Sequence, residues 1–156
     1  MKAIILAAGV GKRLGEFIKD APKCLMKFDG KSLLQRLIDD LALYGVTDIV
    51  IVVGQQKEKI FEELKDLDEK INKKFIVNEN YKIGSVVSLW KASPELNDDV
   101  IIMDADVLCA KQLIGKLVES PQQSCFLIDK DFIDTGEEQK LGIKDGKVFT
   151  ITKGEL

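Results

Sequence analysis

Histidine is absent from the 156-residue sequence, and cysteine and proline each occur only three times. Without imidazole, a metal ion would have to be held by oxygen ligands, which favours magnesium over zinc. The cysteines, Cys24, Cys109 and Cys125, lie in unrelated contexts and form no Cys-x-x-Cys pair. Such spacing is typical of reduced thiols, so we expect a cytoplasmic protein.

The sequence also has no apolar run that approaches the about 20 residues of a membrane span, and its first residues lack the apolar region of a signal peptide. Its charge is mildly acidic, with 23 Lys and Arg against 26 Asp and Glu. This balance argues against a general nucleic-acid surface. The length suits one domain, so we expect residues 1–156 to form a single domain with no membrane or nucleic-acid partner.

The most informative stretch is the first predicted strand with the glycine-rich loop that leaves it. Ala3–Leu6 shows no alternation of apolar and polar residues, which is typical of a strand buried on both faces. In the loop, Gly9 and Gly11 permit positive φ and let several main-chain N–H groups approach one ligand. Lys12 and Arg13 add positive charge, and a guanidinium suits phosphate oxygens. The loop therefore predicts a phosphate-binding turn, and the plainer alternative is a turn with two solvated cations.

Two other kinds of glycine loop fit less well. A P-loop ends in Gly-Lys followed by Ser or Thr, whereas this loop has Gly11-Lys12-Arg13. The dinucleotide fingerprint needs glycine where Leu14 stands and an acid at the end of the second strand. That predicted strand, 48–53, is followed by Gly54-Gln55 and no acid. A nicotinamide dehydrogenase is therefore disfavoured.

What remains is the pattern Leu-Ala-Ala-Gly-x-Gly-x-Arg-Leu over 6–14, followed by Pro22-Lys23-Cys24-Leu25. These blocks resemble the opening signature and the Pro-Lys-x-Leu motif of the nucleotidyltransferases that join a nucleoside triphosphate to a phosphorylated small molecule. The resemblance covers nearly the whole chain and is closest to the cytidylyltransferases that act on phosphocholine and related alcohol phosphates. It implies a fold like that of the nucleotide-diphospho-sugar transferases.

Alternating strands and helices indicate an α/β fold, a three-layer Rossmann-like arrangement whose sheet is mixed but mainly parallel. Ser32 is expected to cap the first helix and Gly45 to end it. The other predicted elements are strands at 48–53, 74–77, 99–103 and 124–128, helices at 57–69, 86–92 (capped by Ser85) and 111–119, and a hairpin of 139–143 with 147–151. Ligands of such sheets bind at the carboxyl ends of the strands, where this sequence gathers glycine, asparagine and aspartate.

A pair of acids follows the strand predicted at 99–103. Asp104 and Asp106 stand two residues apart, which in an extended chain places both carboxylates on one side. Two such carboxylates repel each other, and a divalent cation relieves the repulsion. The plainer alternative is an acid at a helix N-terminus beside a turn residue. In the resemblance, the acid after this strand binds the magnesium that bridges the triphosphate, so Asp106 is the expected Mg²⁺ ligand and Asp104 a candidate co-ligand.

The resemblance also implies roles for the basic residues and the small residues around them. Arg13 would neutralise the β- and γ-phosphates of the triphosphate. Lys23 would reach the α-phosphate or the phosphate of the second substrate. The nucleotide would lie against Leu6, Ala7, Ala8, Gly9, Gly11, Gly84 and Ser85.

Three further residues are candidates for binding the acceptor. Tyr81 and Trp90 could enclose a quaternary ammonium by cation–π contact, although Trp90 could instead lie on a helix face packed against the sheet. Lys140 ends a Gly-Glu-Glu-x-Lys stretch that resembles one in the same cytidylyltransferases, where the lysine approaches the acceptor. An exposed hairpin position is the alternative for Lys140.

These residues together predict a magnesium-dependent transferase. CTP would donate CMP to a small phosphorylated alcohol or phosphonate, with release of pyrophosphate. The acceptor phosphate is already ionised, so alignment and charge neutralisation suffice and no general base is needed. Two alternatives stay open: a sugar-1-phosphate nucleotidyltransferase that uses another nucleoside triphosphate, and a nucleotide-binding module without catalysis.

The length of the chain is itself unusual for the resembled family, whose members normally continue with further strands and a second metal-binding carboxylate. We therefore expect this chain to lack the family's C-terminal part and to transfer slowly. The strand edge at 147–151 would then be uncovered. Since an uncovered edge invites pairing with another chain, we expect a homodimer or aggregation.

Overall fold

The structure of the protein is a computed structural model that describes residues 1–9, 21–136 and 138–153. The chain divides into two compact units, Met1–Cys125 and Phe126–Leu156. No helix within these described ranges is long and apolar enough to cross a membrane.

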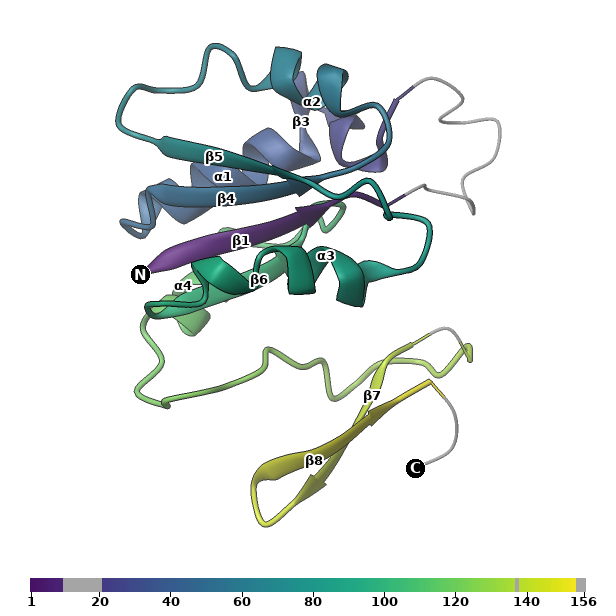
Figure 1. The fold of residues 1–156 in the computed structure, drawn as a ribbon. Coiled ribbons are helices and arrows are strands. Elements are labelled where there is room, and N and C mark those ends of the chain that lie inside the picture. Colours follow the sequence, from purple (N-terminus) through teal and green to yellow (C-terminus); the bar gives the residue numbers. More distant parts are fainter. Residues whose placement is uncertain (10–20, 137, 154–156) are drawn as a thin grey trace. The chain divides into compact units, whose positions relative to one another are not determined.

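The first unit alternates strands and helices along the chain, as predicted (Figure 1). Its strands are β1 (Lys2–Ala7), β2 (Lys27–Phe28), β3 (Lys31–Ser32), β4 (Asp48–Val53), β5 (Asn72–Val77) and β6 (Val100–Asp104). Its helices are α1 (Leu33–Leu43), α2 (Lys57–Glu63), α3 (Ser85–Lys91) and α4 (Lys111–Val118), with the short 3₁₀ turns η2 (Lys23–Leu25) and η3 (Ser93–Glu95).

A four-stranded sheet in the order β5-β4-β1-β6 forms the centre of this unit, and all its neighbouring strands run parallel. β1 and β4 pair from Lys2 opposite Asp48 to Ala7 opposite Val53, so their apolar runs lie in register. β2 and β3 form a separate antiparallel pair. Along the chain, the strand order reverses at β1, with β4 on one side and β6 on the other. Ligands of open α/β sheets bind at the carboxyl ends of the strands at such a reversal.

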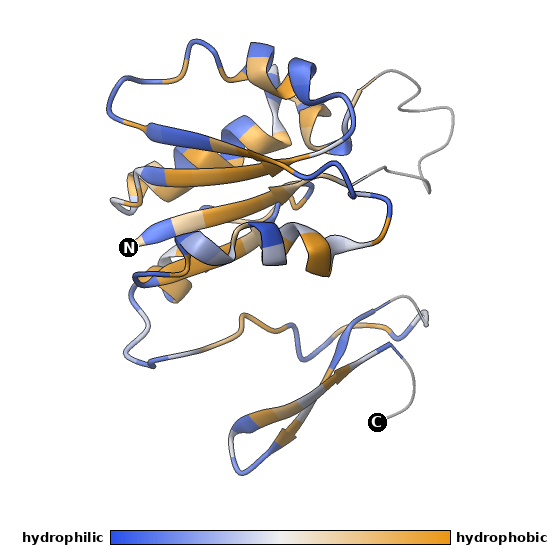
Figure 2. Cartoon of the chain, viewed as in Figure 1, coloured by the Kyte–Doolittle hydropathy of each residue, from blue (hydrophilic) through white to orange (hydrophobic). Residues whose placement is uncertain are grey.

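Helices cover both faces of the sheet, which explains why its central strands β1 and β4 are apolar after their first residue (Figure 2). On one face α1, α2 and α4 pack on the sheet around a core that includes Ile5, Leu34, Leu37, Ile38, Ile51, Ile60 and Ile114. On the other face, the end of α3 and the sheet share a smaller core of Ile4, Val50, Val52 and Ala92. The predicted three-layer, Rossmann-like α/β fold is confirmed.

Helix α1 begins and ends where its local sequence predicts. Ser32 Oγ accepts a hydrogen bond from the Gln35 N–H at 3.1 Å, which satisfies one of the free donors of the first turn. Past the other end, Gly45 takes a φ of +78°, in the left-handed region that suits glycine after a helix. The buried side of α1 carries the leucines that the apolar spacing predicts, among them Leu34, Leu37 and Leu41.

Helix α2 is shorter than predicted, because it ends at Glu63 rather than at Glu69. Lys73, on β5, donates through Nζ to the carbonyls of Leu64 and Lys65. A lysine from a neighbouring strand therefore binds carbonyls that directly follow the last residue of the helix. This contact is tertiary, so no local pattern could predict it.

Two further predictions are wrong. Ser85 is not the cap of α3: Gly84 holds that position with a φ of +146°, a conformation that favours glycine, and no side chain caps the helix. Residues 124–128 form no strand, since none of the described strands pairs with them and Phe126 is 59% exposed. A short apolar run predicts a strand only where a neighbouring strand offers it an edge.

The second unit contains the predicted hairpin, formed by β7 (Lys140–Lys144) and β8 (Lys147–Thr152). Asp145 and Gly146 connect the strands with φ values of 51° and 73°, as a two-residue type I′ turn requires. Gly142 allows the ring of Phe149 to lie across the hairpin, because a Cβ at Gly142 would come within 2.7 Å of that ring. Lys140 Nζ pairs with the carboxylate of Asp134.

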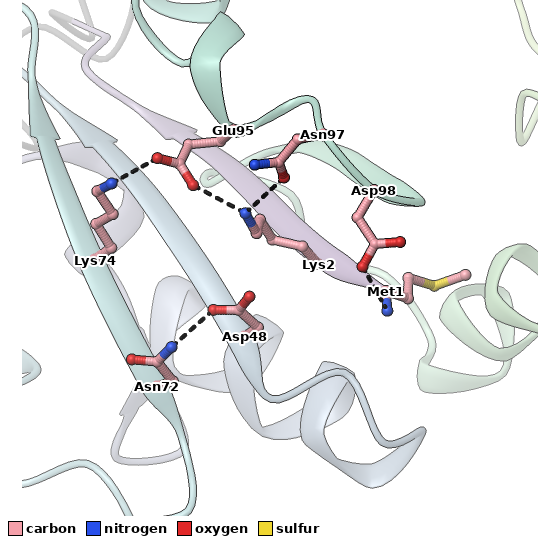
Figure 3. A network of polar contacts seen from close by, with 8 residues as sticks. All are labelled: Met1, Lys2, Asp48, Asn72, Lys74, Glu95, Asn97 and Asp98. Carbon is pink, nitrogen blue, oxygen red and sulfur yellow. Dashed lines mark hydrogen bonds and ion pairs between the residues drawn. The ribbon is translucent and has the colours of Figure 1, made fainter.

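At the amino ends of β1 and β5, Glu95 of η3 binds two lysines (Figure 3). Lys2 Nζ lies 2.9 Å from Glu95 Oε2, and Lys74 Nζ lies 2.6 Å from Glu95 Oε1. Lys2 also donates to Asn97 Oδ1 at 3.3 Å. Glu95 therefore ties the segment after α3 to two strands of the sheet. This cluster therefore lies far from the carboxyl ends of the strands, where ligands of this fold type bind.

We expect Glu95→Gln to destabilise the protein at neutral pH and to have little effect in acid. The hydrogen bond from Lys74, followed by that from Lys2, lowers the pKa of Glu95 from its ordinary value of 4.5. A carboxyl whose pKa is lower in the folded state stabilises the fold above pH 4.5, and this contribution is lost as the pH falls through the folded-state pKa. Urea unfolding at neutral pH and below pH 4.5 measures the difference, with the exposed Glu69→Gln as the control. A difference that stayed constant in acid would contradict the assignment.

Candidate functional site

The carboxyl ends of β1 and β6 border a cleft of about 450 Å³ that lies entirely within the first unit. This volume falls in the range of about 300–1,000 Å³ that small-molecule sites occupy. The cleft is lined by Leu6, Ala7, Ala8, Gly9, Pro22, Lys23, Cys24, Tyr81, Gly84, Ser85, Ser88, Asp104, Ala105 and Asp106. It therefore stands at the reversal of strand order where ligands of this fold type bind.

Most of the residues singled out in the sequence meet at this cleft, although they come from distant segments. They are Leu6, Ala7, Ala8, Gly9, Lys23, Tyr81, Gly84, Ser85, Asp104 and Asp106. Gly11 and Arg13 lie outside the described residues, so their placement stays a prediction. Lys140 belongs to the second unit.

Trp90 is not among the residues that line the cleft, and it is 76% exposed. Helix α3 turns Ser88 inward, and the buried Ala92 follows one turn later. Trp90 stands two residues from each, about 200° around the helix, and therefore faces away from the sheet. In this structure Trp90 therefore neither packs on the sheet nor joins Tyr81 at the cleft.

The two acids are held at the end of β6 by a main-chain hydrogen bond. The Ala105 N–H donates to the Leu6 carbonyl at 3.1 Å, which continues the pairing of β6 with β1 beyond the last strand residue. Ala105 is buried in the core, whereas Asp104 and Asp106 are exposed and line the cleft. Both carboxylates therefore come to the same cleft, as their spacing predicts. Desolvation and, to a lesser degree, the charge of Asp106 raise the pKa of Asp104.

This donor set suits magnesium. Asp104 and Asp106 supply carboxylate oxygens, and the described part of the chain contains no group of three or more His, Cys, Asp or Glu side chains placed to hold a metal. The described residues therefore form no complete set of protein ligands for a metal ion. Mg²⁺ is commonly held by one or two carboxylates together with substrate phosphates, which matches what Asp104 and Asp106 offer.

Lys23 reaches the cleft from the turn η2. Its Nζ lies 3.8 Å from Asp106 Oδ2, so a cation and an acid from opposite parts of the sequence face each other. The neighbouring Cys24 anchors the turn in the core, where burial, with the charge of Asp106, raises the pKa of the thiol to about 12. That thiol stays protonated at neutral pH and is unsuited to act as a nucleophile.

Sequence reasoning missed three residues that shape the cleft, Gly54, Asn78 and Ser88. Asn78 and Ser88 are buried polar residues that bond to each other. Gly54 follows β4, and a Cβ there would come within 2.8 Å of Tyr81 Cβ and 2.9 Å of the Ala8 carbonyl. A glycine directly after a buried strand was the available signal, because it often marks a close approach of other backbone.

We expect Gly54→Ala to displace Tyr81 and to lower stability by about 1–3 kcal/mol, the usual cost of overpacking a filled site. One of the clashing groups is the Ala8 carbonyl, which is main chain and cannot rotate away. Gly9→Ala is the control, since among the described residues no atom lies within 4 Å of the Cβ it would add. Urea unfolding measures the effect, and equal stability of the two variants would contradict it.

Comparison with known proteins identifies the fold and its relatives. Residues 3–130 match the family model of the MobA-like NTP transferase domain. The CTP:phosphoglutamine cytidylyltransferase of Campylobacter jejuni is 25% identical over 100% of this chain and 64% of its own length. The choline-phosphate cytidylyltransferase of Streptococcus pneumoniae is 34% identical over 99% of this chain and 68% of its own length.

The solved structure of the inositol-1-phosphate CTP transferase from T. maritima shares the fold, with a TM-score of 0.76 and 24% identity over 97% of this chain and 63% of that chain. The chain therefore spans 63% to 68% of the length of these three relatives. Nucleotidyltransferases that use sugar 1-phosphates are also among the curated relatives.

Proposed function

Because the chain belongs to the MobA-like NTP transferase family, we propose that it transfers CMP from CTP to a small phosphorylated alcohol or phosphonate, with release of pyrophosphate and dependence on Mg²⁺. The observation that carries the proposal is the convergence of Lys23, Asp104 and Asp106 on one cleft beside the start of the glycine loop. A cation and two acids that could hold a metal ion together suit a triphosphate.

The reaction needs little chemistry from side chains. An oxygen of the acceptor phosphate attacks the α-phosphorus of the nucleotide in line, a new P–O bond forms, and the bond to the β-phosphate oxygen breaks. Lys23 is proposed to neutralise negative charge at the phosphorus that is attacked, and Arg13 to do so at the leaving pyrophosphate. Asp106, with Asp104, would hold the Mg²⁺ ion, which when bound would add positive charge beside the triphosphate.

The choice of CTP rests on relatives. The phosphoglutamine and choline-phosphate enzymes are both named as cytidylyltransferases, and the second is 34% identical to this chain. For the acceptor, Tyr81 lines the cleft, and its ring is proposed to contact a cationic group. Lys140 is proposed to approach the acceptor on the resemblance alone.

A sugar-1-phosphate nucleotidyltransferase is the second candidate, favoured by relatives that transfer to glucose 1-phosphate and mannose 1-phosphate. One experiment decides between the two. Each nucleoside triphosphate is paired with choline phosphate, an alkylphosphonate, glucose 1-phosphate and mannose 1-phosphate, and pyrophosphate release is measured with Mg²⁺ present. We expect release only with CTP and one of the first two acceptors. Release that required a hexose 1-phosphate would establish the second candidate instead.

A further inference from the structure

Asn78, the residue directly after β5, is fully buried and makes three hydrogen bonds to three different segments. Its N–H donates to the Val53 carbonyl at the end of β4, at 2.8 Å. Its Nδ2 donates to Ser88 Oγ on α3, at 2.9 Å. Its Oδ1 accepts from the Asn80 N–H in the following loop, at 3.0 Å. The main chain of Asn78 therefore binds the sheet, and its side chain joins the β5–α3 loop to α3.

The segments held in this way form the uncharged part of the cleft. Tyr81, Gly84, Ser85 and Ser88 line it there, whereas Lys23, Asp104 and Asp106 supply its charges. The uncharged surface suits the nucleoside portion of a ligand, and the charged part suits phosphates and metal.

Helix α3 has little stability of its own. It is seven residues long, and no side chain caps its first turn. Helices this short depend on tertiary contacts for their position. On its buried side it places Ser88, whose hydroxyl is the acceptor for Asn78 Nδ2. The hydrogen bond from Asn78 to Ser88 is therefore a main anchor of α3 and of the loop before it.

We infer that Asn78 is a positioning residue that holds the β5–α3 loop and α3 as the nucleoside-binding part of the cleft. The inference rests on the proposed function for the identity of the ligand, but the positioning itself can be measured without one. Asn78 acts through Ser88 and the loop that carries Gly84 and Ser85, so its loss should weaken binding of the nucleoside and leave binding of the phosphates intact.

The binding test compares CTP with inorganic tripolyphosphate, each titrated with Mg²⁺ into the full chain. For Asn78→Ala we expect about tenfold weaker CTP binding and unchanged tripolyphosphate binding, because the loss of one buried hydrogen-bonding group loosens only the uncharged part of the cleft. Asn72→Ala is the matched control: Asn72 begins β5, the strand that Asn78 follows, but its amide binds Asp48, at the amino end of the neighbouring strand β4, and both affinities should stay the same. An equal loss for both ligands would overturn the inference, since it would indicate general destabilisation.

A second measurement does not depend on nucleotide binding. Amide hydrogen exchange should speed up at Asn80, whose N–H loses its acceptor in Asn78→Ala. Trp90, the single tryptophan, stands on α3, so the decay of its fluorescence anisotropy should show greater mobility of that helix. Ser88→Ala leaves Asn78 in place and tests the same contact if Asn78→Ala does not fold. Unchanged exchange and anisotropy would overturn the positioning role, whereas a parent chain that bound tripolyphosphate but no nucleoside triphosphate would refute the proposed function alone.

Discussion

Replacing Lys23 by alanine is expected to lower turnover by about a hundredfold or more, because losing one group that neutralises developing charge typically costs about 3 kcal/mol of transition-state stabilisation. Lys23 stands on a short turn at the edge of the cleft, and its Nζ lies 3.8 Å from an oxygen of Asp106. A phosphate held by the metal bound to Asp106 would therefore come within reach of Lys23. We expect Arg13→Ala to have an effect of the same size, from the sequence motif.

The matched control is Lys27→Ala. Lys27 belongs to the same segment, is 60% exposed and pairs with Glu63 rather than with an acid of the cleft. Its removal should leave turnover unchanged. Pyrophosphate release under saturating substrates gives kcat for each variant, and urea unfolding should show that Lys23→Ala retains its stability. A near-normal kcat in both Lys23→Ala and Arg13→Ala would remove these residues from the catalytic role.

The parts of the site that could be predicted from sequence all follow the ends of buried strands. Leu6 to Gly9 continue β1, and Asp104 and Asp106 surround the end of β6. Because parallel strands in register bring their carboxyl ends to one edge, the strand assignment already implied that these residues meet. The local signals, an unbroken apolar run and then glycine or aspartate, lay within a few residues of each other.

The residues that were missed depend on contacts between segments far apart in the sequence. Gly54 matters because Tyr81 and Ala8 come close to it, and Asn78 matters because Ser88 lies beside its amide. These contacts depend on the course of the loop after β5, which the sequence alone does not determine. The end of α2 likewise involves a distant segment, since Lys73 from β5 binds the carbonyls of Leu64 and Lys65 just past the helix.

The aromatic residues illustrate a different limit. Tyr81 and Trp90 are both near the predicted site in sequence, yet only Tyr81 lines the cleft. The rotation of α3 about its own axis determines which of its residues face the cleft. The helix is capped by Gly84 rather than Ser85 and turns Ser88 inward, so Trp90 faces outward. A seven-residue helix with one buried serine carries too weak an apolar pattern to fix that phase from sequence.

Asp106→Asn is expected to abolish Mg²⁺-dependent binding of CTP, and Asp104→Asn only to weaken it. The amide keeps the size of the carboxyl but removes the charge that a hard cation requires. In our proposal Asp106 lies closer to the triphosphate than Asp104 does, since Asp106 faces Lys23, which is proposed to bind a phosphate. Asp104 is partly desolvated at the end of its strand and lies beside that charge, which suits a supporting ligand.

Titration calorimetry of CTP with and without Mg²⁺ tests both variants, and Asp99→Asn is the control. Asp99 directly precedes β6, at the opposite end of the same strand, and its side chain is exposed, so its replacement should leave both titrations unchanged. Asp106 is itself exposed, so Asp106→Asn should unfold at the same urea concentration as the parent. If the unsubstituted protein bound CTP equally well with and without Mg²⁺, neither acid would be a metal ligand, and the pair would have to serve the acceptor or the fold.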